Sequence, residues 1–387
     1  MTSAARESCM HFLSRENRQA VIWILATKFI ILLSIFLSFQ FGTFATKQYL
    51  SQFTYPTSEI TWQTAFRTWD GAHCLFIADH GYAKDSPSNP FFPLFPATIA
   101  IVKRFMFGNG LFSGLLLSNL FSFFAFIYLF KFVRERYDLT IARRTLGYAL
   151  VFPTSFFFTR VYSESLFFLL CVLFFYSLSR NQLSRAAIFG FLLPLTRPTG
   201  ILIQLPLMVY ALTDLKLKTM QEKKSLSKYF YVVAPLLGFA LNLLLMKIFT
   251  GNWFEQFYGE SRSVGQFSIA NIFNLRNWFL ENFVFVDWAW YGDINSVIDR
   301  LAFLLYIWLL FGICKQGNWV LFSFALVMGL VPALSDHFIC YMRYLIVIFP
   351  LFIQLAHAKF NHRRVQVVMF LCQLAFNAMH ALSYWVG

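Results

Sequence analysis

An aspartate among aromatic and polar residues is a candidate general base in this sequence. Asp70 stands between Trp69 and Gly71, within the segment Arg67-Thr68-Trp69-Asp70-Gly71-Ala72-His73. Aromatic neighbours partly desolvate a carboxylate, which suits it to accept a proton from a substrate hydroxyl. The alternative is that Asp70 caps a helix starting at Gly71, because aspartate is favoured at that position. The sequence leaves both roles open.

Two histidines and a second aspartate follow in the same segment. His73 lies three residues after Asp70, and Asp79 directly precedes His80. Residues three apart share a helix face, so these pairs could hold a metal ion, but their spacing matches no tight ligand signature. A polar helix at a membrane surface explains them equally well. We therefore predict no metal site and no other cofactor, and treat His73, Asp79 and His80 as candidates for binding the acceptor or orienting Asp70.

A turn between two apolar runs carries a second pair of charged residues. Arg160 and Glu164 occur within Thr159-Arg160-Val161-Tyr162-Ser163-Glu164. Ionisable residues inside a membrane are costly and are functional candidates by default. Arg160 could bind a phosphate and Glu164 could orient a substrate hydroxyl. The alternative is a buried ion pair with no chemical role.

Two further arginines lie near the ends of apolar runs. Arg197 occurs in Thr196-Arg197-Pro198-Thr199-Gly200 and Arg343 in Tyr341-Met342-Arg343-Tyr344. A guanidinium binds phosphate oxygens through paired hydrogen bonds and stays charged. Convergence of Arg197 and Arg343 with Arg160 would therefore suit a lipid phosphate. Snorkelling to lipid headgroups is the alternative, although it explains Arg197, in a Pro-Gly break, less well.

A later segment, 250–297, combines aromatic and charged side chains. Aromatic faces with carboxylates are typical of sugar binding, but an aromatic belt at the membrane interface has the same composition. The sequence does not decide between the two. The residues concerned are Trp253, Glu260, Arg262, Trp278, Asp287, Trp288, Trp290, Tyr291 and Asp293.

The rest of the chain has the composition of membrane helices. Of its 387 residues 58% are hydrophobic and 13% charged, and the mean hydropathy is +0.59. Soluble domains are about a quarter charged, so this surface suits a bilayer. Pro198 and Gly200 divide one long run into two helices, which gives about eleven transmembrane helices in a single membrane domain, 1–387. The apolar runs are 21–42, 111–131, 142–158, 162–179, 186–213, 229–249, 298–314, 317–334, 343–357 and 366–386.

The distribution of basic residues predicts how this domain is oriented in the membrane. The formal net charge is +14, but the basic residues cluster in short segments such as 131–144 and 214–228, which is the positive-inside pattern and not the signature of nucleic-acid binding. With the N-terminus in the cytoplasm, nearly all of these clusters face inward, provided that 91–107 lies at the outer interface without crossing. The outer side then holds a first outer loop, 43–110, with its interfacial helices, a second outer loop, 250–297, and the short turns around 159–163, 196–200 and 335–342. Every candidate residue above falls on that side.

The ordered motifs resemble the GPI second-mannosyltransferase family (PIG-V type), in particular its shorter prokaryotic relatives. The resemblance covers about residues 60–355. It is carried by Trp69-Asp70-Gly71-Ala72-His73, Ile77-Ala78-Asp79-His80-Gly81-Tyr82, Phe91-Phe92-Pro93-Leu94-Phe95-Pro96, Phe152-Pro153-Thr154, Tyr162-Ser163-Glu164-Ser165-Leu166-Phe167, Thr196-Arg197-Pro198-Thr199-Gly200 and Arg343-Tyr344.

This resemblance implies the all-α GT-C glycosyltransferase fold. It further implies transfer of a sugar, most simply mannose, with inversion, from a polyprenyl (dolichyl-type) phosphate to a lipid-linked or glycan acceptor. The catalytic aspartate of the class lies in the first outer loop and maps onto Asp70. The membrane is then a bacterial plasma membrane with a periplasmic site, or an endoplasmic reticulum membrane with a luminal site. The alternative from a different class is a transporter or lipid flippase, which favours internal repeats and midplane sites; neither is evident here.

Overall fold

The computed structural model describes residues 15–53, 59–218, 231–257, 272–284, 296–335, 338 and 340–386. In these parts all regular secondary structure is helical, which confirms the predicted all-α fold class. Much of the second outer loop, 250–297, falls outside the described residues. The predictions for Glu260, Arg262, Asp287, Trp288, Trp290, Tyr291 and Asp293 therefore lie outside the described residues.

Within the described chain, four helices are long and apolar enough to cross a membrane. They are α2 (Arg15–Phe41), α6 (Gly110–Arg136), α14 (Val297–Lys315) and the helix Tyr231–Thr250, which includes α11 (Ala234–Thr250). At a rise of about 1.5 Å per residue, the 27 residues of α6 extend about 40 Å, more than the hydrocarbon thickness of a bilayer.

Further helices fill the other predicted runs. α6 packs along α8, which packs on α9; α7 packs on α17, α10 on α15, and α18 on α2. Each apolar run identified in the sequence therefore contains a helix. The bounds are α7 Leu139–Val151, α8 Glu164–Ser179, α9 Leu183–Leu192, α10 Gln204–Lys218, α15 Trp319–Ser335, α17 Phe349–His357 and α18 His362–Ala381.

Prolines shorten several of these helices. The predicted break in the run 186–213 is confirmed, because α9 and α10 are separated by two 3-10 turns, Leu193–Leu195 and Pro198–Ile203. The run 142–158 is also broken, which was not predicted. Its helix α7 ends before Phe152, whose backbone is extended (φ -58°, ψ 138°). Pro153 follows, and a proline disfavours helical geometry in the residue before it.

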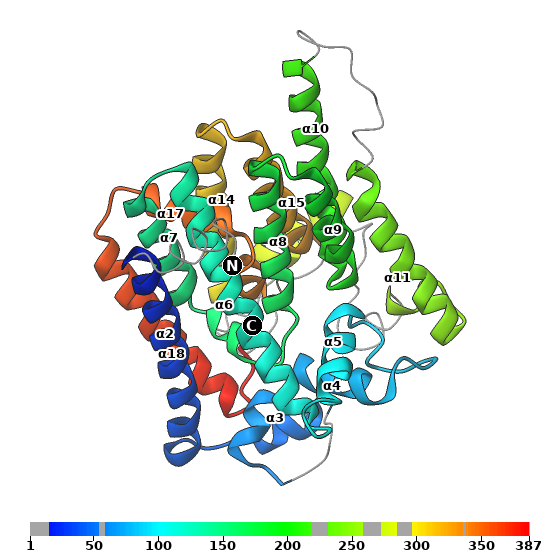
Figure 1. Ribbon diagram of the computed structural model, residues 1–387. Helices are drawn as coiled ribbons and strands as arrows, with labels where there is room; N and C mark the ends of the chain where they lie inside the picture. The colour runs from blue at the N-terminus through cyan, green and yellow to red at the C-terminus, as the bar shows by residue number, and fades with distance from the viewer. Residues whose placement is uncertain are drawn as a thin grey trace, which may run out of the picture.

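The first outer loop forms short helices at one end of the bundle: α3 (Thr46–Ser51), α4 (Asp70–His80) and α5 (Leu94–Lys103) (Figure 1). With ten residues, α5 extends about 15 Å, half of what a membrane crossing needs. It packs on α4 and on α6. The opposite end of α6 carries Arg134, which pairs with Glu16 of α2 at 2.9 Å. The segment with Asp70 and the basic segment 131–144 therefore lie at opposite ends of α6.

Candidate active site

The backbone around Asp70 is tightly constrained. The preceding residue, Trp69, has a positive φ of 52°. Such a value is rare for a residue with a side chain and marks a constrained position. The backbone N–H of Trp69 donates to Oε1 of Gln52 at 2.6 Å. A Cβ atom at Gly71 would stand only 3.1 Å from the carbonyl oxygen of Phe66 and 3.4 Å from that of Val161. Glycine thus lets the start of α4 approach the turn 160–164.

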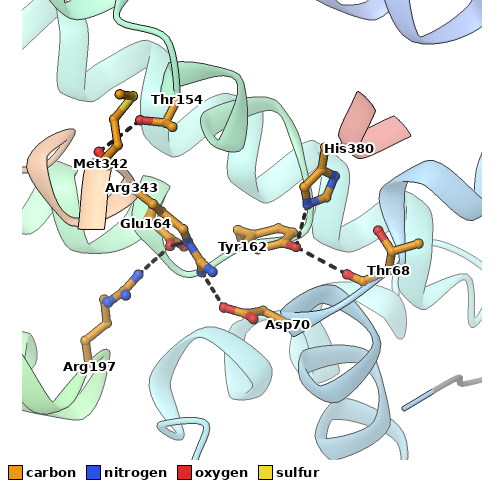
Figure 2. Close-up of polar contacts among 9 residues, drawn as sticks. All are labelled: Thr68, Asp70, Thr154, Tyr162, Glu164, Arg197, Met342, Arg343 and His380. Carbon is orange, nitrogen blue, oxygen red and sulfur yellow. Dashed lines mark hydrogen bonds and ion pairs between the residues drawn. The ribbon is translucent and has the colours of Figure 1, made fainter. Parts of the chain in front are cut away.

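The carboxylate of Asp70 points to another part of the chain and not to its own helix. α4 begins at Asp70 itself, and no side chain caps its first turn. Instead Oδ2 of Asp70 accepts a hydrogen bond from Nη2 of Arg343, which lies on α16 (Tyr341–Leu345) (Figure 2). The capping role considered for Asp70 is therefore not the one seen. Its side chain is 29% exposed, so the carboxylate remains accessible.

Glu164 is the centre of the charged cluster. It is the first residue of α8 and its side chain is only 1% exposed. Its Oε1 accepts from Nε of Arg343 and lies 2.6 Å from Nη1 of Arg197 (Figure 2). The buried ion pair considered for Glu164 does exist, but its partners are Arg197 and Arg343 and not Arg160. The structure thus brings Asp70, Glu164, Arg197 and Arg343 together.

Aromatic rings hold the two arginines in place. The guanidinium of Arg343 lies 4.9 Å from the ring centre of Phe157 and 4.7 Å from that of Tyr162, while that of Arg197 lies 5.6 Å from the ring of Tyr344. Such contacts attract a cation and exclude water from its faces. The edges of both guanidiniums face anionic groups, here the carboxylates of Asp70 and Glu164, and such N–H edges can also bind phosphate oxygens.

Tyr162 connects three separate segments at this cluster. Its hydroxyl donates to the carbonyl oxygen of Thr68 at 3.3 Å and lies 3.2 Å from Nε2 of His380 (Figure 2). Tyr162 and His380 are almost completely buried. The residue beneath Arg343 is therefore tied to the segment before Asp70 and to α18.

Arg160 does not join the cluster. It is fully buried and donates to the carbonyl oxygen of Ala65 and to Asn377, at 3.1 Å to the backbone oxygen and 2.7 Å to Oδ1. Its guanidinium therefore fastens the first outer loop to α18. This geometry gives Arg160 a structural role in place of the phosphate-binding role expected from the sequence.

His73 lies one turn after Asp70, in a mostly apolar environment. Its ring stacks between Phe53 and Phe91, with ring centres 4.4 Å and 4.5 Å away, and its Nδ1 lies 2.9 Å from Oγ of Ser88. Burial lowers the pKa of His73 to about 4, although the charge of Asp70 opposes this shift. His73 is therefore neutral at physiological pH, and its expected role in binding the acceptor or orienting Asp70 stays a prediction.

The other two candidates on α4 lie away from the cluster. Asp79 pairs with Lys103 of α5, and His80 packs on Phe76 with ring centres 4.8 Å apart. Asp79 lies nine positions after Asp70, or about 13.5 Å along the helix. Among the described residues, no group of three or more His, Cys, Asp or Glu side chains could hold a metal ion.

In the described part of the second outer loop, Trp278 has a packing role. Its Nε1 donates to the carbonyl oxygen of Ala333 at 2.6 Å, and its ring contacts Phe303 and Phe338. Trp253 is 44% exposed. No described contact connects Trp253 or Trp278 to the charged cluster. Their expected role in sugar binding therefore stays a prediction.

Sequence reasoning did not single out Tyr162 and His380, which lie at the charged cluster, or Asn377, which holds Arg160. A signal for the last two existed, because both are polar residues within the apolar run 366–386, where such residues are costly. Tyr162 gave no such signal, since tyrosine is common at membrane interfaces.

Together, the helices and the charged cluster define an all-α, polytopic membrane protein with a polar site at one end of its bundle. The chain belongs to the family of mannosyltransferases described as Mannosyltransferase (PIG-V), whose pattern it matches over residues 57–301. This match confirms the family predicted from the sequence and places the chain among glycosyltransferases. No curated protein matches the chain in sequence.

Solved structures of similar shape include ArnT from Cupriavidus metallidurans bound to undecaprenyl phosphate, with 11% identity, a TM-score of 0.48, and 89% of this chain and 62% of that one covered. Another is the Archaeoglobus fulgidus oligosaccharyltransferase in its apo form, also with 11% identity and a TM-score of 0.48, covering 95% of this chain and 56% of the other. The chain thus spans less than two thirds of the length of either protein.

Proposed function

We propose that this protein transfers a sugar, most simply mannose, from a polyprenyl phosphate to a hydroxyl group of a lipid-linked or glycan acceptor, with inversion. The family supports the transferase chemistry. The observation that carries the finer proposal is the position of Arg343, whose guanidinium bonds Asp70 through Nη2 and Glu164 through Nε. A base and a phosphate-binding group thus lie in direct contact.

The mechanism follows from these positions. The acceptor oxygen attacks the anomeric carbon of the donor sugar while its proton passes to Asp70. The bond between that carbon and the phosphate oxygen breaks, and polyprenyl phosphate leaves with the bonding electrons. Arg343 and Arg197 stabilise the charge that develops on the leaving phosphate. A phosphate leaves without being protonated, so one carboxylate suffices, in contrast to the two required by most glycosidases.

Glu164 sets the geometry of the two arginines. Because its Oε1 accepts from both, it holds them close together in the absence of substrate, against their mutual repulsion. An incoming phosphate would then meet two guanidiniums already oriented, which lowers the entropy that binding must lose. The second oxygen, Oε2, is buried and has no hydrogen-bond partner in the described chain; a role for Glu164 in orienting a substrate hydroxyl stays a prediction.

The site is proposed to face the outer or luminal side of the membrane. Val161 contacts Gly114 near the beginning of α6, which puts the turn 160–164 about 33 Å along the helix from Arg136. The basic residues at that far end favour the cytoplasmic side. A polyprenyl phosphate whose chain lies in the bilayer would reach the arginines from the opposite side.

The direct test supplies the full-length protein in membranes with radiolabelled polyprenyl phosphate mannose and candidate acceptors. We expect transfer of label by the unaltered protein. Asp70→Asn should lower it by about 10²- to 10⁴-fold, the usual contribution of a general base. The matched control is Asp79→Asn, on the same helix but paired with Lys103, which should keep near-normal transfer.

Two outcomes would contradict the proposal. Normal turnover by Asp70→Asn would remove Asp70 as the base. Absence of transfer from any polyprenyl phosphate sugar, together with measurable flux of a lipid or solute, would favour a transporter or flippase instead.

A further inference from the structure

Arg343 lies on a helix that is too short to be stable by itself. α16 has only five residues, and no side chain caps its N-terminus. The residue before it, Cys340, has a left-handed backbone with φ 53°. Isolated helical turns of this length are unstable in themselves because so few hydrogen bonds compensate for the ordering of the chain. The position of Arg343 must therefore come from contacts with other elements.

Two of these contacts act on one residue, Met342. Its backbone N–H donates to Oδ1 of Asp299 at 3.1 Å, and its carbonyl oxygen accepts from the hydroxyl of Thr154 at 3.0 Å (Figure 2 shows the second bond). Asp299 lies in the first turn of α14, and Thr154 precedes the turn that leads to Glu164. The residue immediately before Arg343 is therefore held from two sides.

Both hydrogen bonds to Met342 come from side chains that are buried. Asp299 is 3% exposed and Thr154 is fully buried. The carboxylate of Asp299 is itself held, because Oγ of Ser296 donates to its Oδ2 at 3.0 Å. Hydrogen bonds shielded from water and fixed at both ends transmit position effectively.

We propose that Asp299 and Thr154 are positioning residues, which hold the backbone of Met342 so that Arg343 spans Asp70 and Glu164. Neither residue contacts the charged cluster through a described side-chain bond, and both act through Arg343. The proposal rests on the proposed function, in which Arg343 binds the leaving phosphate. A displacement of about 1 Å in such a group can lower a rate by roughly 100-fold.

Paired substitutions test this proposal. Thr154→Val keeps the shape but loses the hydroxyl, whereas Thr154→Ser keeps it. Asp299→Leu loses the acceptor, whereas Asp299→Asn keeps an oxygen for the N–H of Met342. We expect Val and Leu to lower kcat by about 10- to 100-fold with the KM for the acceptor unchanged, and Ser and Asn to stay within about threefold. Since Thr154→Val is nearly isosteric, it serves if Asp299→Leu does not fold.

A double substitution separates positioning from general stability. In an Arg343→Gln background, Thr154→Val should lower the residual rate less than twofold, because its effect passes through the side chain already removed. An equal loss in both backgrounds would overturn the proposal, as would full activity of Thr154→Val and Asp299→Leu.

Hydrogen exchange of the peptide that spans 340–345 tests the positioning role of Thr154 and Asp299 separately from the proposed function. Thr154→Val and Asp299→Leu should accelerate exchange there by about tenfold, whether or not the protein transfers sugar. Unchanged exchange would overturn the positioning role of Thr154 and Asp299, whether or not the protein transfers sugar. Faster exchange in a protein that transfers no sugar would support the positioning role of Thr154 and Asp299 and contradict the proposed sugar transfer.

Discussion

Arg343 donates from Nη2 to Oδ2 of Asp70, joining two residues 273 positions apart in the chain. Arg343, which is proposed to bind the leaving phosphate, is thus hydrogen-bonded to the carboxylate of Asp70, the proposed base. This bond takes one lone pair of Oδ2, whereas no described hydrogen bond engages Oδ1, so the carboxylate can still accept the proton of a hydroxyl. An arriving donor phosphate would compete with Asp70 for the same guanidinium. Donor binding would therefore change the contacts of the proposed base.

Arg343→Lys tests whether the shape of the guanidinium matters, beyond its charge. Lysine keeps the positive charge but offers one nitrogen, which cannot span Asp70 and Glu164 as Nη2 and Nε do. We expect kcat with polyprenyl phosphate mannose to fall about 10- to 100-fold. Steady-state kinetics on the purified variant provides the measurement, and activity equal to that of the unaltered protein would contradict the spanning role.

Glu164→Gln removes the buried negative charge between two arginines. Loss of one partner from a buried ion pair costs about 3–5 kcal/mol, and here Arg197 and Arg343 would repel each other. Thermal unfolding should show a marked loss of stability. The double variant Glu164→Gln/Arg197→Gln should regain part of that stability without regaining activity. No recovery in the double variant would show that charge balance is not the function of Glu164.

Arg160→Met should act on stability and not on donor binding. The substitution leaves the carbonyl oxygen of Ala65 and the side chain of Asn377 without their buried donor, at a cost of about 1–3 kcal/mol for each group. The melting temperature should fall, while the donor KM of the folded protein should be unchanged. Arg197→Met is the matched comparison, for which donor KM should rise. A raised donor KM in Arg160→Met would restore the phosphate-binding role first expected for Arg160.

The burial of His73 predicts sensitivity to acid. Its folded pKa of about 4 lies below the value of about 6.5 for a free histidine. As the pH falls, the unfolded chain binds a proton first, so stability is lost progressively between about pH 6.5 and pH 4, amounting to about 2 kcal/mol at pH 5. His73→Phe, with a ring that can stack between Phe53 and Phe91, should lose less stability over this interval.

Thermal unfolding at pH 7.5 and pH 5 measures this difference. His80→Phe, on the same helix, is the matched comparison for the loss of a histidine. Identical pH dependence in His73→Phe and the unaltered protein would show that His73 is not the source.

The helices and the first candidate residues followed from the sequence, because apolar runs of membrane length and charged residues beside them are local signals. Local signals also existed for breaks that were missed. Pro350 stands near the start of α17, which begins only at Phe349, so the run 343–357 divides into α16 and α17. Because proline has no N–H and its ring clashes with the preceding turn, a helix can begin at Pro350 but cannot run through it unbroken.

Pairings between distant segments could not be read in the same way. The choice of Arg343 and Arg197, and not Arg160, as partners of Glu164 depends on how the helices pack. Arg160 lies only four positions from Glu164, yet its guanidinium reaches Asn377, 217 positions away. Charge and spacing define the candidates, whereas the side of the turn that each arginine faces is decided by packing.

The charged cluster has a consequence for the delivery of substrate. Asp70 and Glu164 balance Arg197 and Arg343, and His73 is neutral, so these five groups together carry no net charge that would attract an anion from a distance. Partitioning of a long hydrocarbon tail into the bilayer would instead confine the donor to two dimensions and raise its local concentration beside the protein. We therefore expect encounter with the donor to depend weakly on ionic strength and strongly on the length of its isoprenoid chain.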